Sequence, residues 1–376
     1  MQYTLNDIIS EYTEKNTGGI YRPVAVGKYG IRQRSEIYKK ELAKDYSKNK
    51  VIHNNTMIIG MGSTQIDFGV LCEDEIYSVS PAYHTFNIKT SLVRSKYFDY
   101  LLQAKNKSYT EKYMIASARQ GKTVNLKDLL KERIEIPCFE TQKEIIKNVD
   151  LIKELIFNEE KYLNLLNELI KSRFIEMFGD VLRNSKNFQT CHFGEYVYQM
   201  NIGPFGSDLK NDCFVPKELS ACMVYEQKHA IEKTLNVPTR YISNEKYSHL
   251  KRFEIGPGDI IVSCRGTVGE CWILPEEAPK GIIHPSLMLI KPNDAVNHEF
   301  LMYLLERILS EQTQQGSGVK MAIRAKDLSK IVCIKPSRED QNHFIDFVHL
   351  VDKSKFVVHS RYFLCDILTL FSSTIA

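Results

Sequence analysis

An internal repeat limits how this chain can fold more than any other feature. The tripeptide Lys-Asp-Leu at 127–129 recurs at 326–328, and the same spacing of 199 residues relates Gln142 to Gln341. A looser match, at offsets of 202 to 204 residues, precedes it. This period is far longer than the roughly 20–50 residues of solenoid repeats. The 376 residues therefore indicate two copies of a domain-sized unit, related by an approximate two-fold repeat.

The first part of each copy mixes strands with helices. Residues 57–61 (MIIGM) and 258–262 (GDIIV) are short apolar runs of strand length. Residues 97–104 and 299–309 have helical spacing, and 201–207 (NIGPFGS) is typical of a turn. Because strands and helices do not alternate steadily, the predicted fold class is α+β rather than a doubly wound sheet.

A long helix is predicted to close each copy. From 145 to 177, ten positions spaced by four and three residues include eight apolar side chains, which is typical of a coiled-coil seam. About 40 helical residues at 1.5 Å each make a rod of about 60 Å. We expect the two rods to pack antiparallel, and the alternative is that each only covers its own domain. The predicted packing residues are Ile145, Val149, Ile152, Ile156, Leu163, Leu166, Ile170, Val348, Val351 and Val358.

The composition is that of an ordinary globular protein. Fifty basic and 46 acidic residues leave a net charge of +4, too small to identify a nucleic-acid partner by itself. Nine cysteines without a Cys-x-x-Cys pair favour reduced thiols and a cytoplasmic location. No run of 18 apolar residues and no secretory signal pattern is present, so we expect no membrane association.

Motifs for covalent chemistry are missing. Residues 120–123 (QGKT) resemble the end of a phosphate-binding loop, but Ala116 stands where that loop needs glycine. No histidine and cysteine spacing suggests a metal site. We therefore expect no catalytic residue, no metal and no cofactor bound by this chain.

Several motifs resemble the specificity (S) subunit of type I restriction–modification enzymes, over essentially the whole chain. The most specific are 202–209 (IGPFGSDL), 258–269 (GDIIVSCRGTVG) and the passage from 328 to 341 into the second rod. In the first copy, 27–34 and 80–83 (SPAY) look like a different variant of the same family.

That resemblance implies two target-recognition domains, each reading half of a bipartite, asymmetric DNA site. They would span 1–139 and 183–337, separated by antiparallel helical spacers at 140–182 and 338–376. In this family two methyltransferase subunits, which use S-adenosylmethionine, dock on the spacers. Two restriction subunits, which use ATP and Mg²⁺, can join them. The specificity subunit itself is not an enzyme.

Candidate DNA contacts are basic, amide and hydroxyl side chains and glycine backbone, because these groups bind phosphates and base edges. Phe205 is expected to pack rather than to touch DNA, and Tyr83 is open between a family motif and a core residue. Any single candidate could also be an ordinary surface charge. The candidates are Lys28, Tyr29, Arg32, Gln33, Arg34, Lys39, Lys40, Arg119 and Lys122 in the first copy, and Gly203, Gly206, Ser207, Lys210, Lys246, Lys251, Arg252, Arg265, Lys320 and Arg324 in the second.

An alternative from another class stays open. The duplicated rods and heads could form a non-catalytic protein-interaction scaffold, which the near-neutral charge permits. Binding of DNA by the assembled complex would distinguish the two.

Overall fold

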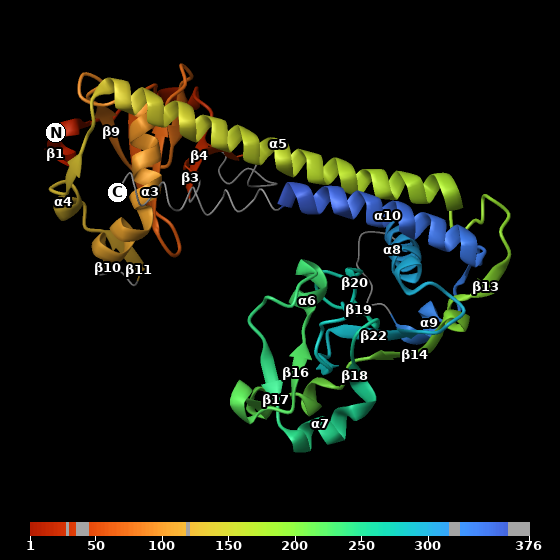
Figure 1. The fold of residues 1–376 in the computed structure, drawn as a ribbon. Coiled ribbons are helices and arrows are strands. Elements are labelled where there is room, and N and C mark those ends of the chain that lie inside the picture. The colour runs from red at the N-terminus through yellow and green to blue at the C-terminus, as the bar shows by residue number, and fades with distance from the viewer. Residues whose placement is uncertain (28–29, 35–44, 118–120, 316–323, 360–376) are drawn as a thin grey trace. The chain divides into compact units, whose positions relative to one another are not determined.

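The computed structural model describes residues 1–27, 30–34, 45–117, 121–315 and 324–359, without the side chains of 311–315 and 356–359. The chain divides into two units, the first containing Met1–Lys161 and the second Tyr162–Val357. Each is built around its own antiparallel sheet (Figure 1). No helix in the described ranges is long and apolar enough to cross a lipid bilayer.

The first unit is centred on a four-stranded antiparallel sheet in the order β2-β9-β6-β7. Its inner residues, such as Met57, Ile59 and Phe68, are fully buried against helix α3. The sheet and its helix are β2 (Ile9–Glu11), β6 (Thr56–Met61), β7 (Ile66–Leu71), β9 (His84–Ile88) and α3 (Ser95–Tyr113).

Smaller elements surround this sheet. Among the described residues, three two-stranded pairs, β3–β4, β10–β11 and the more distant β5–β8, lie around it, and a pair formed by the first and last strands of the unit joins its two ends. These elements are β1 (Gln2–Thr4), α1 (Leu5–Ile8), β3 (Val24–Gly27), β4 (Gly30–Gln33), β5 (Lys50–Ile52), β8 (Tyr77–Val79), β10 (Met114–Ser117), β11 (Gly121–Val124), α4 (Leu126–Leu129) and β12 (Arg133–Glu135).

The second unit repeats this frame with the order β14-β22-β19-β20. Its first and last strands again pair, and a helix equivalent to α3 covers the sheet. The elements are β13 (Thr190–His192), β14 (Val197–Ile202), β19 (Ile260–Ser263), β20 (Cys271–Ile273), β22 (Leu287–Pro292), α8 (His298–Gln315), α9 (Ala325–Leu328) and β23 (Val332–Ile334).

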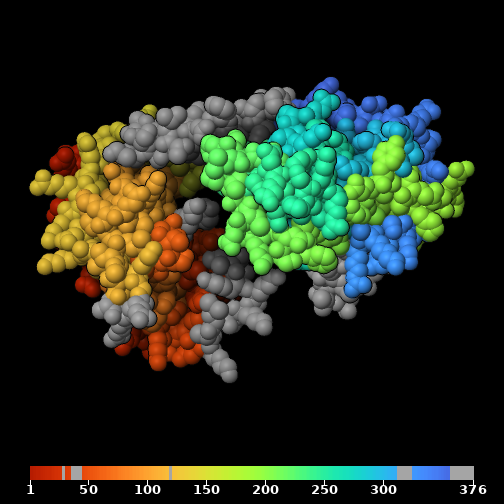
Figure 2. Space-filling model, turned by 90° about the horizontal axis from the view of Figure 1, so that it is seen from below, coloured from red at the N-terminus to blue at the C-terminus, as the bar shows by residue number. Residues whose placement is uncertain are grey.

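Across the described ranges, a five-stranded sheet in the order β15-β17-β16-β21-β18 occurs in the second unit and has no counterpart in the first. Within this described sheet, β16 and β21 run parallel and the other pairs are antiparallel. In Figure 2 the green to cyan residues that include this sheet form a continuous face of the second unit. Its elements are β15 (Phe214–Val215), β16 (Cys222–Tyr225), α6 (Gln227–Glu232), β17 (Arg240–Ile242), α7 (Asn244–Leu250), β18 (Glu254–Ile255) and β21 (Gly281–Ile283).

The predicted duplication and α+β class are confirmed. The two four-stranded sheets have the same strand order, and the repeated Lys-Asp-Leu tripeptides lie in the equivalent short helices α4 and α9. The helices predicted at 97–104 and 299–309 are α3 and α8. The strands predicted near 57–61 and 258–262 are β6 and β19, which are equivalent in the two sheets.

The first long helix, α5 (Phe139–Phe178), ends where Gly179 adopts a left-handed conformation with φ of +67°. All ten seam positions from 145 to 177 are buried or half-buried in the structure. Ile145 packs against the first unit's core, whereas Leu166 and Ile170 are buried in the second unit's core. Both expected roles of the helix, covering a domain and pairing with another helix, therefore occur along its length.

The second long helix, α10 (Arg338–His359), runs antiparallel beside the end of α5 (Figure 1). The Phe174 and Phe178 rings lie 5.3 and 5.8 Å from the Phe344 ring. Val348 and Val351 are buried in the same core. The side chain of Val358 and residues 360–376 of the predicted spacer lie outside the described residues.

Candidate nucleic-acid interface

Three loops meet at one end of the strands in the second unit's four-stranded sheet. In the register, Ile202 and Ser263 end their strands opposite Met288 and Leu287, where β22 begins. The loop N–H of Gly203 donates to the Leu287 carbonyl at 2.9 Å. We call residues 203–208, 264–269 and 284–286 the second loop edge, because backbone bonds make them one continuous surface.

The second loop edge is exposed and rich in polar groups. Arg265, Gly206 and Ser207 are exposed, and Gly203 is half-buried. A side chain at position 203 would place its Cβ 2.3 Å from the His284 carbonyl oxygen, so only glycine fits there. The prediction that Phe205 packs is wrong, because its side chain is 76% exposed. Such a surface offers a cation, a hydroxyl and an aromatic ring to a ligand.

A charged cluster adjoins this edge. Arg240 donates to the Glu226 carboxylate and lies over the Phe214 ring at 3.9 Å. Burial alone would raise the pKa of Glu226, but hydrogen bonds from Arg240 and Lys228 outweigh it and hold that pKa below its usual range. Burial lowers the pKa of His284, so its imidazole favours the neutral form. The cluster therefore fixes the strands that support the edge.

Three of the predicted DNA contacts lie at the end of the five-stranded sheet that is farther from the charged cluster. Arg240, at the start of β17, pairs with Val224 beside the charged cluster. The chain leaves β17 at its opposite end and forms α7 there, away from the cluster. Lys246 lies on α7, and Lys251 and Arg252 follow it as exposed residues. The structure does not bring these three residues together with Arg265.

Two further candidates of the second unit are exposed. Lys210 precedes a short helical turn after the loop 203–208. Arg324 precedes α9, where its carbonyl accepts the helix's first backbone bonds. Lys320 lies outside the described residues.

The equivalent first loop edge consists of residues 12–15, 62–65 and 80–83. These loops follow β2 and β6 and precede β9, as their counterparts do in the second sheet. Tyr83 packs over Gly60, where a Cβ would lie 2.0 Å from the ring. Its hydroxyl donates to the Val26 carbonyl at 3.3 Å. Tyr83 is therefore a packing residue, and the motif 80–83 is the segment that leads into strand β9.

The β3–β4 hairpin carries the described part of the first copy's basic cluster. Arg32 and Gln33 are exposed on β4, and the Arg34 guanidinium lies 5.7 Å from the centre of the Tyr46 ring. Ile31 holds the hairpin on the main sheet, since its side chain lies 2.8 Å from where a Cβ on Gly69 would stand. Lys122 is exposed on β11. The candidates Lys28, Tyr29, Lys39, Lys40 and Arg119 lie outside the described residues.

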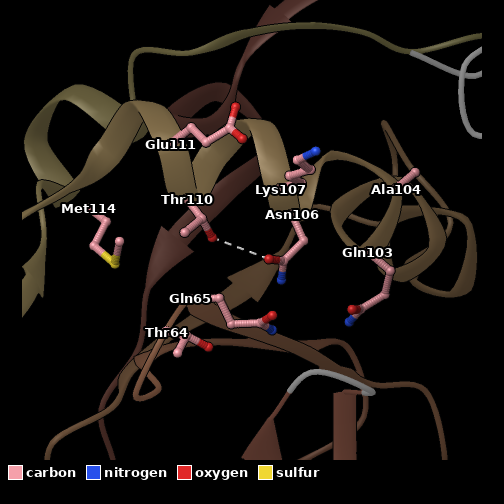
Figure 3. Close-up of a pocket in the computed structure, with 9 residues that line it drawn as sticks. All are labelled: Thr64, Gln65, Gln103, Ala104, Asn106, Lys107, Thr110, Glu111 and Met114. Atoms are coloured by element: carbon pink, nitrogen blue, oxygen red, sulfur yellow. Dashed lines mark hydrogen bonds between the residues drawn. The ribbon is translucent and has the colours of Figure 1, made fainter. Parts of the chain in front are cut away.

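A cavity of about 490 Å³ opens between α3 and the β6–β7 turn (Figure 3). Asn106 donates to the Ile66 carbonyl at 2.9 Å and accepts from Thr110 at 3.2 Å. The amide nitrogen of Gln65 is buried at this cavity. Of the amide side chains that line this cavity, Asn106 and Gln103 already donate to backbone carbonyls.

Sequence reasoning missed the lining of this cavity. Gln65 and Gln103 come from a turn and a helix that the fold brings together, and no motif links them. Across the described ranges, no three His, Cys, Asp or Glu side chains gather as a metal site would require.

Comparisons with known proteins fit this architecture. A curated relative, a putative type I restriction enzyme specificity subunit of Methanocaldococcus jannaschii, is 25% identical over 261 residues, covering 68% of this chain and 61% of the relative. The chain thus spans less than two thirds of that relative.

Two solved structures are similar. One, from work on complex assembly and conformational transition of the type I R-M system, has a TM-score of 0.55 and 14% identity, covering 100% of this chain and 97% of that one. A crystal structure of the type I restriction-modification S subunit from M. genitalium has a TM-score of 0.49 and 14% identity, covering 100% and 94% of the two chains. The first likeness supports a common fold.

The family model described as the type I restriction modification DNA specificity domain matches residues 7–168 and 224–359, which is most of the chain. The two matched regions coincide with large parts of the two structural units. The chain therefore belongs to the type I restriction modification DNA specificity domain family.

Proposed function

We propose that this chain is the DNA-specificity subunit of a type I restriction–modification complex and reads a bipartite, asymmetric site. The observation that carries this proposal is one frame built twice with different loops. The sheets β2-β9-β6-β7 and β14-β22-β19-β20 have the same order, but the residues at their loop edges differ. Two domains with the same sheet but different loop residues are suited to recognise two DNA half-sites of different sequence.

The loop chemistry supports base reading. The second loop edge exposes Arg265, and arginine pairs through two hydrogen bonds with guanine in the major groove. The first unit offers amides at its cavity and the exposed Arg32 and Gln33 of β4. Phosphate contacts by the remaining exposed lysines would add affinity without sequence preference.

An exposed apolar stripe on α5 supports docking of partner subunits. Five apolar side chains at heptad spacing are 45–59% exposed, namely Leu151, Leu155, Tyr162, Leu165 and Leu169. At 100° per residue this stripe lies about a quarter turn from the seam. A helical partner with its own apolar seam would cover it.

We propose that two methyltransferase subunits dock on the long helices, one for each copy of the repeat, and that one of them covers this stripe. They would supply S-adenosylmethionine chemistry, and two restriction subunits using ATP and Mg²⁺ would join them. This chain would then recognise DNA and position its partners without catalysing a reaction. Such a complex would work in the cytoplasm, where its DNA target lies.

The scaffold alternative is less favoured. A protein-interaction scaffold would need no difference between its two sets of loops, whereas the two loop edges here present different groups. Membership of a DNA specificity family also supports DNA as the ligand of the heads.

Selection of DNA from a random duplex library tests the proposal. The probe is the purified complex of this chain with its cognate methyltransferase subunit. We expect enrichment of two short, different sequences separated by a fixed gap. Enrichment of one contiguous sequence, or none from a complex that is assembled and folded, would contradict the proposal.

A further inference from the structure

The side chain of Gln227 holds the loop that carries Arg265. Gln227 is the first residue of α6, and its amide nitrogen donates to two carbonyls of that loop. The acceptors are the carbonyl of Arg265 at 2.6 Å and the carbonyl of Thr267 at 3.0 Å. One amide therefore fixes the backbone on both sides of Gly266.

The rest of the loop is closed by Ser263. Its hydroxyl donates to the Thr267 carbonyl at 2.5 Å and accepts from the Glu270 N–H at 2.9 Å. Gly266 has φ of +66°, and its missing side chain leaves the Gln227 amide 3.4 Å from the Cβ position. These hydrogen bonds thus hold the loop in one defined conformation.

Arg265 itself is free to bind a ligand. Its side chain is exposed, and within the described residues its guanidinium has no hydrogen-bond or ion-pair partner. In the described part of the chain, this residue is joined to α6 by the hydrogen bond that its carbonyl accepts from Gln227. A guanidinium on a fixed backbone loses less conformational freedom on binding than one on a mobile loop.

We propose that Gln227 is a positioning residue for specificity, and that it holds Arg265 where the guanidinium reads a guanine in the half-site of the second unit. This inference rests on the proposed function. Bidentate arginine–guanine contacts require both N–H groups to reach O6 and N7 together, so a loosened backbone lowers discrimination more than affinity. Gln227 would act through Arg265 and would not touch the base.

The test measures methyl transfer by the assembled complex on short duplexes with one base pair changed at a time. Arg265→Ala should lower discrimination at one G·C pair of one half-site by about tenfold or more. Gln227→Glu, which removes both donors at nearly constant size, should lower discrimination at the same pair. Both variants should keep wild-type discrimination at the other half-site. Glu232→Gln, exposed on the same helix, is the matched control and should change neither.

Distinct results would overturn the inference. If Arg265→Ala weakens all duplexes equally and reduces the salt dependence, the residue contacts phosphate and reads no base. If Arg265→Ala has the expected effect but Gln227→Glu has none, Gln227 does not position it. Should Gln227→Glu fail to fold, Gln227→Met removes the same donors without adding a charge, and it should lower discrimination at the same base pair. A wild-type complex that discriminates at no base pair would instead refute the proposed function.

Discussion

Gln142 and Gln341 make the same two hydrogen bonds, one in each unit. The amide oxygen of Gln142 accepts from the Arg94 N–H at 2.8 Å, and that of Gln341 accepts from the Asn297 N–H at 2.8 Å. Each amide nitrogen donates to the proline carbonyl five residues earlier, at 2.9 and 3.0 Å. Both side chains are almost fully buried. Each glutamine therefore ties the start of a long helix to the helix that covers the sheet.

Replacing either glutamine should destabilise its own unit. Gln142→Ala and Gln341→Ala each leave a backbone N–H and a carbonyl without their partner in a mostly half-buried setting, which should cost about 1–3 kcal/mol in total. Denaturant unfolding followed separately for each unit would measure the loss. The exposed neighbours Lys143→Ala and His343→Ala are controls. An equal loss in the controls would show that the hydrogen bonds are not the cause.

The aromatic cluster at the end of α5 should dominate the stability of the second unit. Phe178 is fully buried, and its ring lies 5.1 Å from that of Phe300. Phe178→Ala should cost about 3–5 kcal/mol, because it leaves a cavity in a packed core. Ile175→Ala, at a 45% exposed position on the same helix, should cost much less. Thermal unfolding would compare the two variants. Similar losses of stability would show that the aromatic cluster does not dominate the stability of the second unit.

The second unit should lose stability below neutral pH. Burial lowers the pKa of His229 and of His284 below the ordinary 6.5. The unfolded chain therefore binds protons near pH 6.5 while the folded chain does not, so stability is complete above that pH and falls as pH drops towards the folded pKa values.

Urea unfolding between pH 7.5 and 5 measures this dependence. The double variant His229→Gln, His284→Gln should flatten the slope in that range. His249→Gln, at an exposed position, should leave it unchanged. A slope that persists in the double variant would assign the effect to other groups.

Charge on the exposed stripe of α5 should weaken assembly without unfolding the chain. Leu165 is 58% exposed, so Leu165→Glu keeps a good helix former but opposes burial against a partner. We expect at least tenfold weaker binding of the methyltransferase subunit by titration calorimetry. Asn164→Glu, exposed and well away from the stripe, should bind normally. Equal binding by both variants would exclude the stripe as the docking surface.

The duplicated frame could be predicted because its signals are local. The repeated Lys-Asp-Leu, the apolar runs of β6 and β19 and the heptad spacing of α5 each lie within one short segment. Neighbouring residues in sequence are enough to encode such elements.

The missed features depend on contacts between distant segments. Phe178 meets Phe300, more than 100 residues later in the sequence, and no heptad position identifies it. Phe205 is exposed, and its loop begins at Gly203, whose close approach to the His284 carbonyl joins two segments far apart in the sequence. Likewise, Gln227 approaches Arg265 only after α6 has packed beside β19.

Methylome sequencing of cells that express this chain with its cognate methyltransferase subunit tests directly whether the chain specifies a bipartite DNA site. We expect a new asymmetric motif with two different half-sites and a fixed gap, methylated in each half. Unchanged methylation, in cells where both subunits are soluble and co-purify, would contradict it.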